Sequence, residues 1–211
     1  MSMDRERILK EIKELRAVAV LRAPSADGAI RACEAMLRGG MRAMEITTTT
    51  TDWAKALAGV AALDGAYAGV GTLVAVDQVA VAKDAGARFA VSPGYSPAIA
   101  DACGAADLPY LPGIATPTEL MAAQSHPAVA ALKLFPAESL GGVAYMKALK
   151  GPFPGVDFLP TGGVSAENAG GYLAAGAIAV GLSAPCKGDL IRDEAWDRIE
   201  AIARDVMAAV A

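Results

Sequence analysis

Eight short apolar runs recur along the sequence, and their regular spacing is the feature that most restricts the fold. They occupy residues 17–21, 43–46, 66–71, 88–91, 110–112, 129–133, 157–160 and 177–181. Their ends lie about 23 residues apart on average, which is room for one strand, one helix and two tight turns. Nearly continuous apolar strands that alternate with helices are typical of a parallel sheet covered by helices, and eight such strands can close into a barrel. The spacing therefore predicts an α/β fold, a single (β/α)8 TIM barrel over residues 1–211.

The segments between the runs carry the patterns expected of helices. Residues 29–36 form one apolar stripe that two glycines end, and Ser165 stands where an N-cap would open a later helix. An amphipathic pattern over residues 1–16 predicts an N-terminal capping helix, and an apolar stripe over residues 190–211 predicts a C-terminal helix. An open, doubly wound sheet is the competing architecture, but the Gly-x-Gly-x-x-Gly turn typical of it is not evident.

The composition excludes several classes of protein. Hydrophobic residues make up 54% of the chain, charged residues make up 20%, and the mean hydropathy is +0.36, which excludes a disordered chain. The net charge is −4 and no basic cluster is interleaved with aromatic residues, so we expect no nucleic-acid partner. The uncharged stretch 168–186 is interrupted by glycines and a proline, and it predicts short elements rather than a membrane span.

The cysteines and the single histidine predict neither a disulfide framework nor a metal site. Cys33, Cys103 and Cys186 are odd in number and far apart, which is typical of small buried thiols in a reducing, cytoplasmic environment. His126 has no companion imidazole and is expected at the surface. We therefore expect neither a metal nor a cofactor.

Lys133 is the residue that most strongly indicates chemistry. It ends the sixth apolar run, and the alternation of a strand can place it on the face that lines the barrel. The active sites of such barrels lie at the carboxyl ends of the strands. Loss of hydration favours the uncharged amine of a lysine, and a free amine attacks carbonyl carbons. Two interpretations of Lys133 stay open. It is a nucleophile, or it only pairs with a neighbouring carboxylate or extends its ammonium group to the rim of the barrel.

Glu45 adds a carboxylate near the end of the second run, on the face expected to point inward. A single inward glutamate is most often half of a structural ion pair, because a buried charge needs compensation. Beside Lys133, however, Glu45 adds a group that can exchange protons to a lysine that can react with carbonyl carbons. A carboxylate that exchanges protons next to an amine that forms a Schiff base is the minimum set for an imine-forming lyase.

Two loops near the end of the chain favour phosphate binding. Residues 161–163 follow the seventh run and residues 181–183 follow the eighth, and barrel enzymes commonly hold phosphate with backbone N–H groups in these two loops. Ordinary turn glycines are the alternative interpretation of either loop alone. Arg22 and Thr72, just past the first and third runs, offer a guanidinium and a hydroxyl to a carboxylate.

Six motifs in register resemble the 2-keto-3-deoxy-6-phosphogluconate (KDPG) and 4-hydroxy-2-oxoglutarate aldolases, and the resemblance runs from about residue 17 to residue 188. The motifs are Glu45-Ile46-Thr47, Gly69-Val70-Gly71-Thr72, Ser92-Pro93-Gly94, residues 111–119, Lys133-Leu134-Phe135-Pro136-Ala137-Glu138, and Pro160-Thr161-Gly162-Gly163-Val164. Together they are far more specific than any one of them.

The resemblance implies a metal-free class I aldolase that cleaves 2-dehydro-3-deoxy-6-phosphogluconate to pyruvate and D-glyceraldehyde 3-phosphate, and that assembles as a homotrimer. It implies that Lys133 forms the Schiff base with the C2 ketone, and that Glu45 moves protons during dehydration and C3–C4 cleavage. Thr72 would bind the pyruvyl carboxylate. The remaining implied contacts are Pro93, Phe135 and Thr161 in the pocket, and Gly162, Gly163 and Ser183 at the phosphate.

Two positions depart from the family pattern. Many members carry an arginine four residues after the catalytic glutamate, where this chain has Thr49, and we expect Arg22 to bind the carboxylate instead. The segment 181–183 is one residue shorter than the Gly-x-Gly-Ser pattern of the family, so the loop expected to bind phosphate is shorter by one residue.

Three functions stay open at this stage. The first is the aldolase for the phosphorylated sugar acid. The second is a related imine aldolase for 2-dehydro-3-deoxy-6-phosphogalactonate, 4-hydroxy-2-oxoglutarate or an unphosphorylated 2-keto-3-deoxy acid. The third is a non-catalytic barrel that binds a phosphorylated metabolite, in which Lys133 and Glu45 are only an ion pair.

Overall fold

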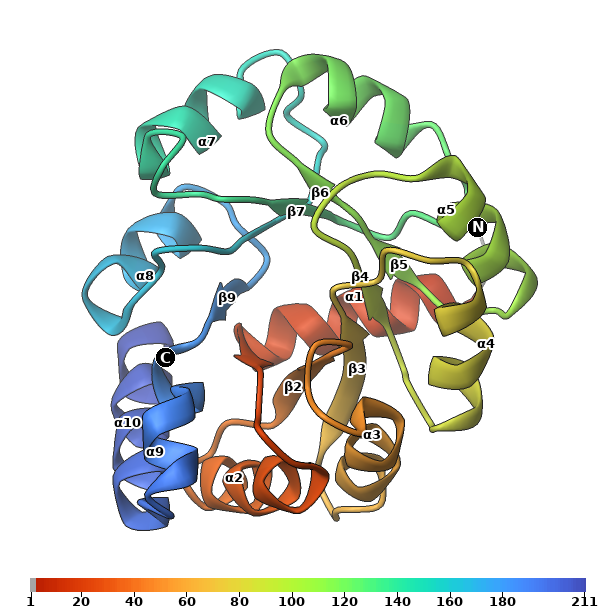
Figure 1. Ribbon diagram of the computed structural model, residues 1–211. Coiled ribbons are helices and arrows are strands. Elements are labelled where there is room, and N and C mark those ends of the chain that lie inside the picture. Colours follow the sequence, from red (N-terminus) through yellow and green to blue (C-terminus); the bar gives the residue numbers. More distant parts are fainter. Residues whose placement is uncertain (1–2) are drawn as a thin grey trace.

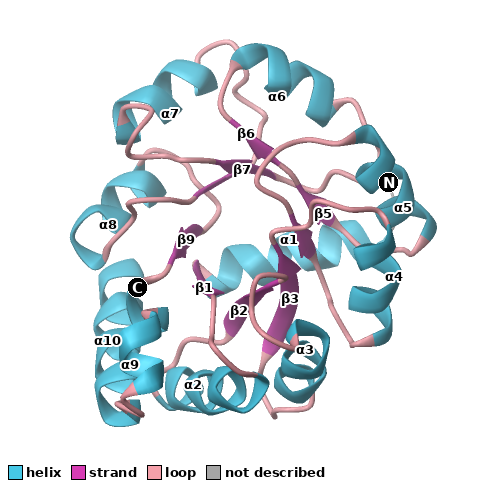
Figure 2. Ribbon diagram, in the orientation of Figure 1, coloured by secondary structure: helices cyan, strands magenta, loops and turns pink. Residues whose placement is uncertain are grey.

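The computed structural model describes residues 3–211 and shows strands at the centre of the molecule with helices around them (Figures 1 and 2). The strands are β1 (Ala17–Leu21), β2 (Ala43–Thr47), β3 (Tyr67–Gly71), β4 (Ala90–Val91), β5 (Tyr110–Leu111), β6 (Gly113–Ile114), β7 (Leu132–Leu134), β8 (Phe158–Pro160) and β9 (Val180–Leu182). The helices are α1 (Met3–Leu15), α2 (Ala26–Arg38), α3 (Trp53–Ala61), α4 (Asp77–Asp84), α5 (Pro97–Ala105), α6 (Pro117–Gln124), α7 (Gly142–Lys150), α8 (Ala166–Ala174), α9 (Gly188–Arg192) and α10 (Trp196–Val210), with a 3-10 turn at Ala184–Cys186.

The strands form a curled parallel sheet in two parts. Six of them pair in the order β5-β4-β3-β2-β1-β9, and the other three pair in the order β6-β7-β8. Every ladder is parallel. Isolated parallel bridges, Tyr110 with Val129 and Thr161 with Gly181, join the two parts at both edges. The prediction of an α/β fold with parallel strands is therefore confirmed.

The elements differ from the expected ones at two places. The run 110–112 contains only β5, and β6 begins directly after it; between them lies Pro112, a residue without the N–H that a sheet ladder needs. The single helix expected over residues 190–211 is instead α9 followed by α10. Glu194 between them has a φ of 49°, which a right-handed helix cannot contain. Of the helix expected over residues 1–16, residues 1 and 2 lie outside the described part of the chain.

Local sequence sets the starts of several helices. Ser25 caps α2, because its hydroxyl accepts a hydrogen bond from the Gly28 N–H at 3.1 Å. Thr116 and Glu119 form a capping box at α6. Ser165 begins α8, as the sequence predicts. Within residues 3–211, no helix is long and apolar enough to cross a bilayer.

The core has two layers, one on each side of the sheet. A large cluster fills the space between the sheet and the surrounding helices. A smaller cluster lies inside the curl, where α1 packs across the amino ends of the strands with Ile8 and Ile12. Its other members include Val18, Ala43, Tyr67, Phe89, Leu111, Ala131, Leu159 and Ala179. α1 and this cluster fill the amino ends, and the interior opens toward the carboxyl ends of the strands.

Candidate active site

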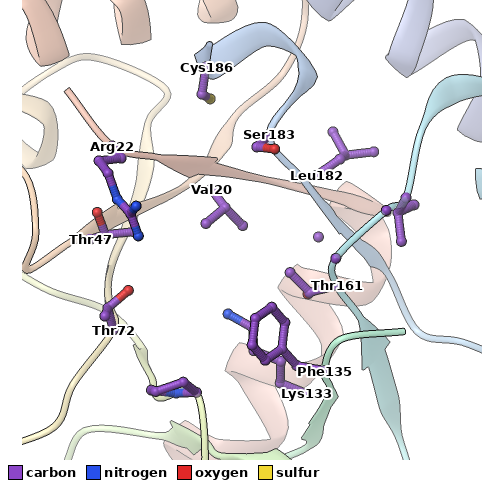
Figure 3. Close-up of a pocket in the computed structure, with 15 residues that line it drawn as sticks. Val20, Arg22, Thr47, Thr72, Lys133, Phe135, Thr161, Leu182, Ser183 and Cys186 are labelled. Carbon is purple, nitrogen blue, oxygen red and sulfur yellow. The ribbon is translucent and has the colours of Figure 1, made fainter. Parts of the chain in front are cut away.

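A cavity of about 380 Å³ lies at the carboxyl ends of the strands (Figure 3). It is lined by Val20, Arg22, Thr47, Thr72, Pro93, Lys133, Phe135, Thr161, Gly162, Gly163, Val164, Gly181, Leu182, Ser183 and Cys186. This set contains every site residue expected from the sequence except Glu45, which lies just beneath. Parallel strands explain this convergence, since their carboxyl ends meet on one side of the sheet.

Lys133 and Glu45 form a buried pair at the floor of the cavity. Lys133 lies on β7 and Glu45 on β2, and Nζ lies 3.3 Å from Oε1. The side chains are 6% and 0% exposed. The second oxygen of Glu45, Oε2, is buried and has no hydrogen-bond partner among the described residues. A buried carboxylate with one free oxygen beside an amine can accept a proton from a bound molecule.

A glycine on the neighbouring strand makes room for Glu45. Thr47 of β2 pairs with Gly71 of β3, and a Cβ atom on Gly71 would lie 2.0 Å from Glu45 Oε1. Any side chain at position 71 would therefore displace the carboxylate from Lys133. From the sequence, Gly71 is expected only as part of a motif, and its role in accommodating Glu45 is visible only in the packing of β2 against β3.

Arg22 is held at one wall of the cavity by a chain of threonine hydroxyls. Its Nε donates to Thr49 Oγ1 at 2.8 Å. The hydroxyls of Thr49 and Thr47 lie 2.9 Å apart, and Thr47 donates to the Leu21 carbonyl at 3.0 Å. Figure 3 shows the Arg22 guanidinium extending toward the cavity. Thr49, at the position where the resemblance leads us to expect an arginine, thus contacts Arg22, the arginine expected to bind the carboxylate instead.

Thr72 lies on the same side of the cavity as Arg22 (Figure 3). Its φ is 59°, a left-handed conformation that is unfavourable for a β-branched residue. The Thr48 hydroxyl donates to the Thr72 carbonyl at 2.7 Å, which helps to hold this conformation. Such local strain, costing about 1–3 kcal/mol, is found mainly where a site requires it. Arg22 and Thr72 together can bind a carboxylate.

The loop after β8 presents backbone donors to the cavity. Gly162 and Gly163 have φ values of 95° and 79°, and within residues 3–211 neither N–H donates a hydrogen bond to another part of the chain. The Glu138 N–H donates to the Gly162 carbonyl at 3.0 Å and braces the loop. Free N–H groups on successive residues of this kind bind anions. Ser183, exposed at the rim after β9, adds a hydroxyl.

Cys186 lines the cavity, a position that was not expected from the sequence. The three cysteines were expected only as buried thiols, and all three are free and buried. Burial raises the pKa of the Cys186 thiol, and the negative charge of Glu45 raises this pKa further. The thiol therefore stays protonated at neutral pH and does not compete with Lys133 as a nucleophile.

His126 lies outside the cavity. Its Nε2 is 3.1 Å from Asp101 Oδ1, and its Nδ1 accepts a hydrogen bond from the Ala128 N–H. Among the described residues, no group of three or more histidine, cysteine, aspartate or glutamate side chains could hold a metal ion together.

Comparisons with known proteins point to one family. The family model "KDPG and KHG aldolase" matches residues 8–202. The chain is 32% identical to a 2-dehydro-3-deoxy-phosphogluconate aldolase of Haemophilus influenzae over 98% of both chains, and 34% identical to a KHG/KDPG aldolase of Escherichia coli over 90% of both. Among solved structures it resembles a KDPG aldolase of Legionella pneumophila, with a TM-score of 0.84, 31% identity, and coverage of 90% of this chain and 93% of that one. That structure holds pyruvate captured as a covalent carbinolamine intermediate.

Proposed function

The chain belongs to the KDPG and KHG aldolase family, and on this basis we propose that Lys133 and Glu45 carry out the aldol cleavage of 2-dehydro-3-deoxy-6-phosphogluconate to pyruvate and D-glyceraldehyde 3-phosphate. The protein is a lyase. The observation that most supports the assignment of residues is the contact of 3.3 Å between Lys133 Nζ and Glu45 Oε1 at the floor of the cavity.

The first half of the reaction forms an imine. A proton passes from Nζ to Oε1, and the free amine attacks the C2 ketone of the substrate. The resulting carbinolamine takes up a proton at its oxygen from Glu45 and loses water, which leaves a protonated imine on Lys133. The buried surroundings of both side chains disfavour isolated charges and support transfer of the proton within the pair.

The second half breaks the C3–C4 bond. Glu45 takes the proton of the C4 hydroxyl, the aldehyde product leaves, and the bonding electrons move into the protonated imine to give an enamine. Protonation of the enamine at C3 and attack of water on the imine release pyruvate and restore Lys133. The unpartnered Oε2 of Glu45 supports its role, because it can accept a proton without first giving up a hydrogen bond.

The remaining residues hold the two ends of the substrate. Arg22, fixed by Thr49, and Thr72 bind the carboxylate, and the N–H groups of Gly162 and Gly163 with the Ser183 hydroxyl bind the phosphate. Pro93, Phe135 and Thr161 line the pocket between them. The Phe135 ring centroid lies 5.3 Å from Lys133 Nζ, within the range of a cation–π contact with the ammonium group.

Reduction with borohydride in the presence of pyruvate tests the lysine assignment. We expect mass spectrometry to find a reduced pyruvyl adduct on the Lys133 peptide. The Lys150 peptide should stay unmodified, because this amine donates to two backbone carbonyls outside the cavity. An unmodified Lys133 peptide would favour a barrel that only binds a phosphorylated metabolite.

Glu45→Gln should slow cleavage by about 10²–10⁴-fold if the carboxylate transfers protons.

A related substrate, 4-hydroxy-2-oxoglutarate, is the second candidate, because the relative from Escherichia coli carries both names. It shares the 2-oxo acid that forms the imine but has no phosphate. Cleavage rates for the two substrates decide between them, and Ser183→Ala should impair only cleavage of the phosphorylated one. Cleavage of 2-dehydro-3-deoxy-6-phosphogalactonate tests the preference for one C4 epimer.

The same proposal covers the architecture and assembly. We infer that the chain is one domain, residues 1–211, in which β5 and β6 act as one strand and the two parts of the sheet form one (β/α)8 barrel. The bridges at Tyr110–Val129 and Thr161–Gly181 support closure. A homotrimer in the cytoplasm fits the family resemblance, and the exposed side chains of Val74, Val76 and Val81 offer an apolar contact. Sedimentation equilibrium measures the mass of the assembly.

A further inference from the structure

A second hollow, of about 430 Å³, adjoins the catalytic cavity and shares Arg22, Ser183 and Cys186 with it. In Figure 3, Ser183 and Cys186 lie on the side of the cavity away from Lys133. The hollow therefore extends the site outward between Arg22 and Ser183, on the side away from Lys133. Lys187 and Arg192 line the hollow but not the catalytic cavity, and the proposed reaction does not use them.

The hollow carries positive charge without a balancing carboxylate. Arg22, Lys187 and Arg192 line it, and no aspartate or glutamate does. Lys187 and Arg192 are exposed, and neither forms an ion pair within residues 3–211. Neighbouring cations differ in this respect, since Arg31 pairs with Glu194 at 3.2 Å and Lys55 pairs with Asp27 at 3.1 Å. A concave surface with charge of one sign attracts ions of the opposite sign.

We propose that this hollow is an anionic subsite adjoining the phosphate site, from which Lys187 and Arg192 neutralise the phosphate monoester of the substrate on the Ser183 side; this inference rests on the proposed function. A phosphate monoester carries up to two negative charges, which two cations can neutralise. Hydroxyls of Ser183 and Thr51 line the same hollow and can donate to phosphate oxygens. Lys187 and Arg192 thus supply charged contacts in addition to the backbone N–H groups of Gly162 and Gly163.

Inhibition by inorganic phosphate tests the proposal. The variant Lys187→Gln/Arg192→Gln should raise the inhibition constant for phosphate, and the KM for the phosphorylated substrate, by about five- to tenfold, with kcat changed less than about twofold. The dependence of KM on salt concentration should become weaker, because fewer charge contacts are screened.

A matched control carries the same change in net charge away from the hollow. Lys147→Gln on α7 with Arg198→Gln on α10 removes two exposed cations, and we expect wild-type inhibition by phosphate. Equal inhibition constants in the two double variants would overturn the subsite. Loss of pyruvate trapping at Lys133 in the Lys187→Gln/Arg192→Gln variant would also overturn it, because the weaker inhibition by phosphate would then result from a general structural defect. Failure of the wild-type protein to form the pyruvyl adduct would instead contradict the proposed aldolase chemistry.

Discussion

At the residue scale, neighbouring strand ends combine side chains that are far apart in sequence. Val20 pairs with Glu45 and Leu21 with Ile46, so Arg22 lies next to Thr47 at the ends of β1 and β2. The alternation of a strand was sufficient to predict that Glu45 and Lys133 share one face. The hydroxyl chain from Thr47 through Thr49 to Arg22 was not predictable, because it depends on the path of the loop after β2.

This hydroxyl chain predicts a role for Thr49 in holding Arg22. Thr49→Val removes the acceptor for Arg22 Nε while keeping a β-branched side chain of similar volume. We expect the KM for pyruvate in the condensation direction to rise about three- to tenfold, which corresponds to the loss of one hydrogen bond, with little change in kcat. Thr49→Ser keeps the hydroxyl and should restore a KM close to that of the wild type. Equal KM values for the valine and serine variants would contradict this role.

At the element scale, β2 and β3 pack so closely that position 71 has no room for a side chain larger than the hydrogen atom of glycine. Gly71 of β3 lies beside Glu45 of β2, and the alternation of apolar residues gives no sign of this contact. The lengths of the apolar runs also exceed those of several strands. The run 129–133 overlaps β7 only at Leu132 and Lys133, because Val129 forms an isolated bridge with Tyr110 of β5 and does not belong to the ladders of β7.

The contact between β2 and β3 predicts the effect of Gly71→Ala. The added methyl group overlaps with Glu45 Oε1, so we expect the free energy of unfolding to fall by about 1–3 kcal/mol and turnover to fall with it. In a Glu45→Ala background the overlap is absent, and most of this destabilisation should disappear. Urea denaturation of the four proteins in this double-mutant cycle measures the coupling. Additive free-energy changes would show that the two residues do not compete for the same space.

At the scale of the whole molecule, the spacing of the apolar runs was sufficient to predict a parallel α/β fold. It could not predict how the sheet divides, because the two-residue strands β4, β5 and β6 leave short ladders whose edges depend on single bridges such as Tyr110–Val129. Nor could it predict the second hollow, whose cations come from opposite ends of the chain. The buried thiols, by contrast, were predicted from the odd number and wide separation of the cysteines, and their burial has a consequence for stability.

The stability of the molecule should fall in alkali, in part because of Cys103. Burial raises the pKa of this thiol from 9.0 to about 12. A group with a raised pKa in the folded state stabilises fully below the pKa of the unfolded chain, and this contribution is lost as the pH rises through the pKa of the folded state. The free energy of unfolding of the wild type should therefore fall by about 1 kcal/mol per pH unit relative to Cys103→Ala between about pH 9 and pH 12. Urea denaturation under reducing conditions measures both proteins, and a difference between them that stays constant over this range would show that the thiol ionises equally well in the folded protein.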